Sequence, residues 1–132
     1  MKKILFLGSK PIGHACLSFL IDHKFDLDCE VVGVLSNDNK RFDSSQSIKD
    51  LAVCSSIPFI EDLDSIMKLR NVDYIISVQY HLILKKNHVE VANELAINLH
   101  MAPLPEFRGC NQFSFAIYNG AKEFGTTLHR IE

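Results

Sequence analysis

The chain has 132 residues, which is enough for one domain with a buried core and close to the lower limit for an enzyme with two substrates. Hydrophobic residues make up 47% of it and charged residues 23%, which are the proportions of an ordinary globular chain and exclude the disordered and fibrous classes. The formal net charge of −2 gives no general reason to expect nucleic acid or an anionic membrane as a partner.

The cysteines and the N-terminal residues indicate the cellular compartment of the protein. Cys16, Cys29, Cys54 and Cys110 form no C-x-x-C pair, so neither a zinc site nor a disulfide framework is indicated, and we expect reduced thiols. The opening apolar run ILFLG is too short for the core of a signal peptide, and no later stretch would span a membrane. We therefore expect a cytoplasmic protein.

Apolar runs alternate with segments of helical periodicity. In chain order, the pattern predicts a strand at 2–8, a helix at 11–23, a strand at 29–36, a mobile loop at 37–47, a helix at about 47–55, a brief strand at 57–60, a short helix at about 63–70, a strand at 72–78, a helical turn after Lys85 through Val89 and a strand at 94–100. Pro11 suits a first helical turn.

The strands read as continuous apolar runs, which is typical of parallel strands covered on both faces. The sequence therefore predicts an α/β fold with a doubly wound, mostly parallel sheet. In such sheets ligands bind beyond the carboxyl ends of the strands, near the point where the strand order reverses. Gly8, Tyr80 and His100 lie at or just after three predicted strand ends, so we expect three loops around one crevice.

The turn GSKPIG, after the first strand, follows the order of a dinucleotide-binding turn because it leaves a strand and opens a helix. It lacks the middle glycine of G-x-G-x-x-G, and no acidic residue clearly ends the second strand. Lys10 and Pro11 occupy the place where the backbone would have to approach a pyrophosphate. We interpret the segment as a tight turn that packs the first helix on the sheet.

Asn98 and His100 stand at the polar end of the last predicted strand. Positions two apart in a strand share a face, so both side chains can reach one space. A carboxamide can donate to a developing oxyanion, and an imidazole can accept a proton near neutral pH, which together suit transfer of an acyl group onto an amine. Direct transfer is favoured, since Cys110 would need an activating base to act as a nucleophile. The alternative is an ordinary hydrogen-bonded pair at a strand end.

Longer blocks carry a resemblance to a known family. INLHMAPLPEFRG resembles the I-N-x-H-x-S-x-L-P-x-[YF]-[RK]-G block of the formyltransferases that use N10-formyltetrahydrofolate, and AIYNGAKEFGTTLH is similar to their A-[IL]-x-x-G-x-x-x-[ST]-G-[VT]-T segment. KILFLGSKPIGHACLSFL and SVQYHLIL also fit, so the resemblance covers essentially the whole chain. It implies a Rossmann-like N-terminal catalytic domain at 1–132, with N10-formyltetrahydrofolate as cosubstrate and no metal.

The resemblance also implies roles for single residues. Asn98 and His100 match the catalytic pair. The positions that match the pterin pocket, which the segment lines largely through backbone groups, and the turn over it are Val78, Gln79, Tyr80, His81, Leu82, Ile83, Leu104 and Pro105. The positions expected to contact the acceptor substrate are Met101, Arg108, Gly109, Cys110, Asn111 and Gln112. The alternatives are that His81 is a polar surface residue and that Asn111 and Gln112 only begin a helix with core aromatics.

The acceptor is expected to be a nucleotide-linked amino sugar, with dTDP as the nucleotide and lipopolysaccharide O-antigen biosynthesis as the setting. The reason is that Cys110-Asn111-Gln112 replaces the A-[AS]-P of many relatives that act on tRNA. Nucleic acid and membrane are not expected as partners, and the full-length protein could form a homodimer. Two alternatives remain open: a methionyl-tRNA formyltransferase, and a non-catalytic Rossmann-like ligand-binding module.

The family's third catalytic residue is an Asp whose position falls just beyond Glu132. Such a residue orients the His and fixes its tautomer. We therefore expect this chain to be the N-terminal part of a longer enzyme and to be poorly active or inactive by itself.

Overall fold

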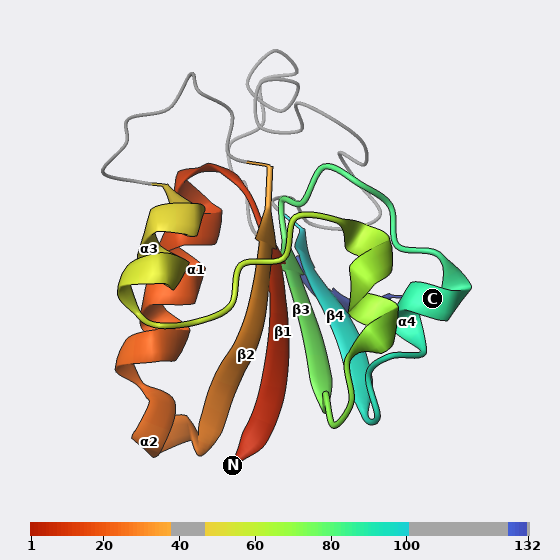
Figure 1. Cartoon of the computed structure of the whole chain (residues 1–132), viewed down its shortest axis with the longest axis horizontal. Coiled ribbons are helices and arrows are strands. Elements are labelled where there is room, and N and C mark those ends of the chain that lie inside the picture. The colour runs from red at the N-terminus through yellow and green to blue at the C-terminus, as the bar shows by residue number, and fades with distance from the viewer. Residues whose placement is uncertain (38–46, 101–126, 132) are drawn as a thin grey trace.

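The computed structural model of the chain describes residues 1–37, 47–100 and 127–131. Figure 1 shows a twisted sheet with helices on both of its faces. Residues 38–46, which make up nearly all of the predicted mobile loop, lie outside the described part.

The sheet has five strands in the order β2-β1-β3-β4-β5. Their bounds are β1 Lys2–Gly8, β2 Cys29–Ser36, β3 Tyr74–Val78, β4 Leu95–His100 and β5 Thr127–Arg130. The first four strands are parallel, which confirms the predicted α/β class and mostly parallel sheet. The edge strand β5 runs antiparallel to β4 and was not expected from the sequence.

Helices cover the two faces unequally. On one face lie α1 (Lys10–Asp22) and α3 (Ile48–Cys54), with the short α2 (Lys24–Leu27) at the lower end of the view. The 3₁₀ helix η2 (Leu63–Lys68) and the short helix α4 (Lys86–Val89) lie on the other (Figure 1). The fold is therefore doubly wound, as the sequence predicts.

Three local expectations need correction. The helix expected to end at His23 is followed by α2, because His23 turns the chain and Asp28 then ends α2 in the left-handed region at φ 52°. The helix expected at about 63–70 is a 3₁₀ helix that ends at Lys68, since Leu69 is extended. The brief strand expected at 57–60 is a single bridge between Phe59 and Val34.

Each face of the sheet buries its own apolar cluster because alternate strand residues point to opposite faces. The α1 cluster contains Ile4, Phe6, Leu17, Cys29, Val31, Val34, Ile48, Ala52 and Val78. The η2 cluster contains Leu5, Leu7, Leu35, Leu63, Ile66, Val72, Ile75, Leu84 and Ala96. The strand β1 contributes alternate residues to both clusters, which is why its sequence reads as one apolar run.

Candidate active site

The carboxyl ends of the parallel strands form one edge of the sheet. Gly8 pairs with Ser36 on one side and with Val78 on the other, and Val78 pairs with Leu99. The chain passes from β1 outward to β2 and then returns to β3 on the opposite side of β1, so the strand order reverses between β1 and β3. This is the place where open α/β sheets bind their ligands.

Asn98 and His100 end β4 at this edge. Ala96 belongs to the η2 cluster, whereas Ile97 and Leu99 line a groove on the α1 side. Since residues alternate between faces, positions 98 and 100 share the η2 face with Ala96. Asn98 is half-buried and pairs in register with Ser77 of β3. The backbone thus brings the two sequence-predicted catalytic positions to one face at the predicted edge.

Residues 79–84 follow β3 and lie on that same face. Gln79 turns the chain through the left-handed region at φ 57°. Tyr80 and Leu84 then pack against the η2 cluster, and His81 contacts the Tyr80 ring edge-on with ring centroids 4.7 Å apart. Burial, and then the negative charge of Asp62, raise the pKa of Tyr80, so its phenol stays protonated at neutral pH.

The tip of this segment is apolar and exposed. Leu82 is 47% exposed, and Ile83 is 90% exposed. The resemblance assigned Val78 and residues 79–83 together to the pterin pocket. The side chain of Val78 belongs to the buried α1 cluster, and its carbonyl accepts a hydrogen bond from the backbone N–H of Ser9 at 3.1 Å. Any contact from Val78 to a ligand at the carboxyl edge would therefore have to come from its backbone.

The turn after β1 lies next to residues 79–84 at the strand-order reversal. Ser9 is the N-cap of α1, but no side-chain hydrogen bond caps the helix and its first turn contains no acidic residue. The Oγ of Ser9 is buried and has no hydrogen-bond partner among the described residues. Lys10 adopts φ 66°, and its Nζ lies 3.5 Å from Oε1 of Gln79. A cation and an uncapped helix N-terminus thus stand together at the edge.

The tight-turn interpretation of GSKPIG is confirmed. A Cβ on Gly13 would lie 3.1 Å from Ile48 Cδ1 and 3.4 Å from the carbonyl oxygen of Val78, so α1 approaches the sheet closely at this glycine. The sequence interpretation missed, however, that the same turn leaves Ser9 unpartnered and turns Lys10 toward the edge. The Ser-Lys pair directly after a strand end was the available signal.

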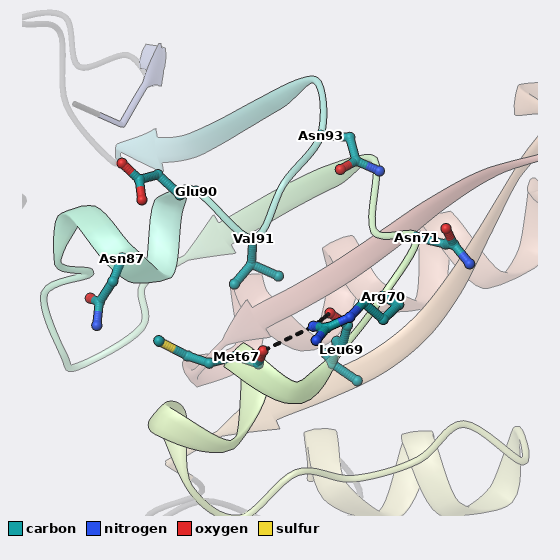
Figure 2. Close-up of a pocket in the computed structure, with 8 residues that line it drawn as sticks. All are labelled: Met67, Leu69, Arg70, Asn71, Asn87, Glu90, Val91 and Asn93. Atoms are coloured by element: carbon teal, nitrogen blue, oxygen red, sulfur yellow. Dashed lines mark hydrogen bonds between the residues drawn. The ribbon is translucent and has the colours of Figure 1, made fainter.

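Two cavities are found in the described part of the chain. One is an apolar groove of about 360 Å³ beside α1, lined by Ala15, Cys16, Phe19, Leu20, Ile76, Val78, Ile97 and Leu99. The other, of about 300 Å³, is shown in Figure 2 and is lined by Met67, Leu69, Arg70, Asn71, Asn87, Glu90, Val91 and Asn93.

The cavity of Figure 2 is not at the carboxyl edge. Asn71 and Asn93 shortly precede β3 and β4, so this cavity lies at the amino ends of those strands. Nη1 of Arg70 already donates to the carbonyl oxygens of Met67 at 3.4 Å and Leu69 at 3.2 Å. The guanidinium of Arg70 is therefore already partnered within the chain.

Several predicted site residues lie outside the described part of the chain, namely Met101, Leu104, Pro105, Arg108, Gly109, Cys110, Asn111 and Gln112. The edge strand adds two positions that the sequence interpretation missed as site neighbours. In the register of β4 with β5, His129 is opposite Asn98 and Thr127 is opposite His100. The β-branched residues of GTTLHRIE were the available signal.

Within the described residues, no cluster of three or more His, Cys, Asp or Glu side chains could hold a metal ion. The thiols of Cys16, Cys29 and Cys54 are free. None of the helices in the described ranges is both long and apolar enough to cross a membrane.

Comparison with known proteins gives the family. The profile described as formyl transferase matches residues 2–132. The chain belongs to the formyl transferase family. The methionyl-tRNA formyltransferase of Clostridioides difficile (strain 630) is 30% identical to it over 137 residues, which cover 95% of this chain and 43% of that relative. The formyl transferase domain described here thus spans less than half the length of that relative.

Solved structures agree with the fold. WlaRD, a sugar 3N-formyl transferase crystallised in the presence of dTDP and 5-N-formyl-THF, is 30% identical with a TM-score of 0.79, and the match covers 100% of this chain and 47% of that one. An N-formyltransferase from Helicobacter canadensis, in complex with folinic acid and dTDP-3-aminofucose, is 26% identical with a TM-score of 0.74, covering 100% of this chain and 48% of the other. The formyl transferase fold of this chain is therefore shown by both sequence and structure.

Proposed function

We propose that this chain is the catalytic domain of an enzyme that transfers a formyl group from N10-formyltetrahydrofolate to the amino group of a nucleotide-linked amino sugar. The observation that carries the proposal is the position of Asn98 and His100 on one face of β4, at the carboxyl edge and on the side of residues 79–84. Membership of the formyl transferase family gives this pair its expected chemistry.

The turn after β1 supports an acceptor that carries phosphate. The uncapped N-terminus of the 13-residue helix α1 and the Lys10 ammonium together suit the oxygens of a nucleoside diphosphate. The two sugar formyltransferase structures provide independent support, because both were crystallised with dTDP or a dTDP-sugar and with a formyl-folate. We propose dTDP as the nucleotide on this basis.

In the proposed reaction the unprotonated sugar amine attacks the formyl carbon of the cosubstrate. A bond forms between the amine nitrogen and that carbon, and the tetrahedral oxygen carries the negative charge. The Asn98 carboxamide would donate to this oxygen, while His100 would accept the proton lost by the amine. The bond from carbon to N10 then breaks, and the proton passes to N10, so that tetrahydrofolate leaves and no charge is left over.

The direct test is the pair of variants Asn98→Ala and His100→Ala in the full-length protein. Each should lower turnover by about 10²-fold or more, which is the range for an oxyanion donor or a general base. Asn93→Ala is the matched control, because Asn93 is an exposed amide near the opposite end of the same strand. Turnover within a few-fold of wild type in both edge variants would contradict the proposed roles.

A second candidate is formylation of methionyl-tRNA, favoured by the 30% identity to the Clostridioides difficile enzyme across 95% of the chain. The net charge of −2 leans only mildly against it, since binding to tRNA calls for a basic surface and this chain matches only 43% of that relative's length. Formylation assays with a panel of dTDP-amino sugars beside charged initiator tRNA would separate the two. Transfer to tRNA alone would replace our proposed acceptor, and transfer to neither would favour a non-catalytic module.

A further inference from the structure

One buried titratable side chain lies outside the proposed chemistry. His88, in α4, is only 2% exposed, and it stands in the polypeptide shortly after the exposed tip at Leu82 and Ile83. Both of its ring nitrogens have partners. Its Nδ1 accepts a hydrogen bond from the backbone N–H of Lys85 at 3.0 Å, and its Nε2 lies 2.7 Å from Oδ1 of Asp64.

These two contacts define the state of the ring. Because Nδ1 accepts the Lys85 N–H, the proton of the neutral imidazole is on Nε2, where it can be donated to the Asp64 carboxylate. Asp64 belongs to η2, and its side chain is 80% exposed. His88 therefore links Lys85, the first residue after the 79–84 segment, to Asp64 of η2. Only the tautomer with the proton on Nε2 can make both hydrogen bonds.

Within residues 1–37, 47–100 and 127–131, the segment between β3 and Lys85 has few other attachments. No backbone–backbone hydrogen bond between described residues involves Gln79 to Leu84. At its start the segment is held by the Ser9 to Val78 hydrogen bond, by the contact of Lys10 Nζ with Gln79 Oε1 at 3.5 Å and by Tyr80 packing on the η2 cluster. At its end it is held by the buried Leu84 and by the Lys85 to His88 to Asp64 chain of hydrogen bonds.

We propose that His88 and Asp64 are positioning residues that hold the 79–84 segment in the conformation that binds the formyl-folate cosubstrate. The proposal rests on the proposed function, which assigns this segment to the pterin. A ligand that binds only one conformation of a segment binds more weakly when the fraction of that conformation falls. Loss of the His88 to Asp64 hydrogen bond should therefore weaken cosubstrate binding and leave the chemical step unchanged.

The test uses Asp64, because its exposed side chain can be replaced without opening the core. In the full-length protein, Asp64→Ala should raise the dissociation constant for 5-formyltetrahydrofolate by up to about fivefold, because a buried donor left without a partner lowers the fraction of the binding conformation. The KM for N10-formyltetrahydrofolate should rise similarly, while kcat at saturation and the KM for the acceptor stay within about twofold. Asp64→Asn keeps an acceptor oxygen for Nε2 and should restore binding.

Asp26→Ala is the matched control, because Asp26 is also an exposed acid at the start of a short helix, on the other side of the sheet. An unchanged dissociation constant in Asp64→Ala would overturn the inference, as would an equal effect in Asp64→Asn or in Asp26→Ala. If the wild-type protein itself binds no folate, both this inference and the proposed function fail. If the wild type binds folate and only the variants disagree, the proposed function stands and the positioning role is wrong.

Discussion

Gly8 ends β1 at the edge where the candidate site lies, and it has no room for a side chain. A Cβ at this position would lie 2.6 Å from Cε1 and 2.9 Å from Cζ of the buried Phe6 ring. Gly8→Ala should therefore lower the free energy of unfolding by about 1–3 kcal/mol, the range for overpacking a tight core. Urea denaturation would measure the change.

Gly33 provides the comparison for Gly8. Its added Cβ would meet only the ends of flexible side chains, Cδ1 of Ile60 at 3.0 Å and Cδ1 of Leu5 at 3.1 Å. Gly33→Ala should cost less than Gly8→Ala because these atoms can shift. An equal or larger loss of unfolding free energy in Gly33→Ala would show that contact with the Phe6 ring is not what destabilises Gly8→Ala.

The thiols should differ in reactivity. Burial raises the pKa of Cys16, and burial together with the negative charge of Asp28 raises that of Cys29, so both hold less thiolate at neutral pH. Cys54 is exposed. We expect iodoacetamide to modify Cys54 before Cys16 and Cys29, as followed by mass spectrometry of the digested protein. Early modification of Cys29 would contradict its burial in the α1 cluster.

At this scale the sequence predicted the spacing of Asn98 and His100, because a two-residue period in a strand is a local property. The state of Ser9 could not be predicted, since it depends on which groups the folded chain brings to its hydroxyl. The His88 to Asp64 hydrogen bond could not be predicted either, because its partners are 24 residues apart in the chain.

At the scale of elements, α3 illustrates an end set by local chemistry. The Oγ of Ser47 accepts a hydrogen bond from the backbone N–H of Asp50 at 3.2 Å, which satisfies one donor of the first turn. Ser47→Ala should lower the free energy of unfolding by about 1 kcal/mol, whereas Ser47→Asn should retain most of the stability. Thermal denaturation of both variants would check this, and equal melting temperatures would argue against the cap.

The elements found from the sequence are those with a strong period of their own. The strands β1 to β4 are apolar runs, and α1 has apolar residues at helical spacing, so both types follow from local pattern. The strand β5 has only four residues, and its pairing with β4 is a non-local contact. The 3₁₀ form of η2 and the short α2 depend on how the chain meets the sheet, which the period of a few residues does not determine.

At the scale of the whole molecule, one ion pair joins the amino ends of distant strands. Lys2 of β1 donates to Glu94, just before β4, and this hydrogen bond, with a second one from Tyr74 of β3, lowers the pKa of Glu94. A carboxyl group with a lowered pKa contributes stability above its unfolded pKa and loses it as the pH falls through the folded value.

The stability difference between wild type and Glu94→Gln should therefore be largest near neutral pH and shrink between about pH 5 and pH 3. It should be small throughout and decrease further in high salt, because the groups are exposed. Urea denaturation at several pH values would measure it. A difference that grows as the pH falls would contradict the assigned direction.

The whole account depends on the carboxyl edge of the sheet being the place where formyl transfer occurs. The most direct measurement is a crystal structure of the full-length protein with 5-formyltetrahydrofolate bound. We predict that N10 of the folate, the nitrogen that carries the formyl group in the cosubstrate, lies beside Asn98 and His100, with residues 79–84 against the pterin. A folate bound at the amino ends of β3 and β4, in the cavity of Figure 2, would contradict it.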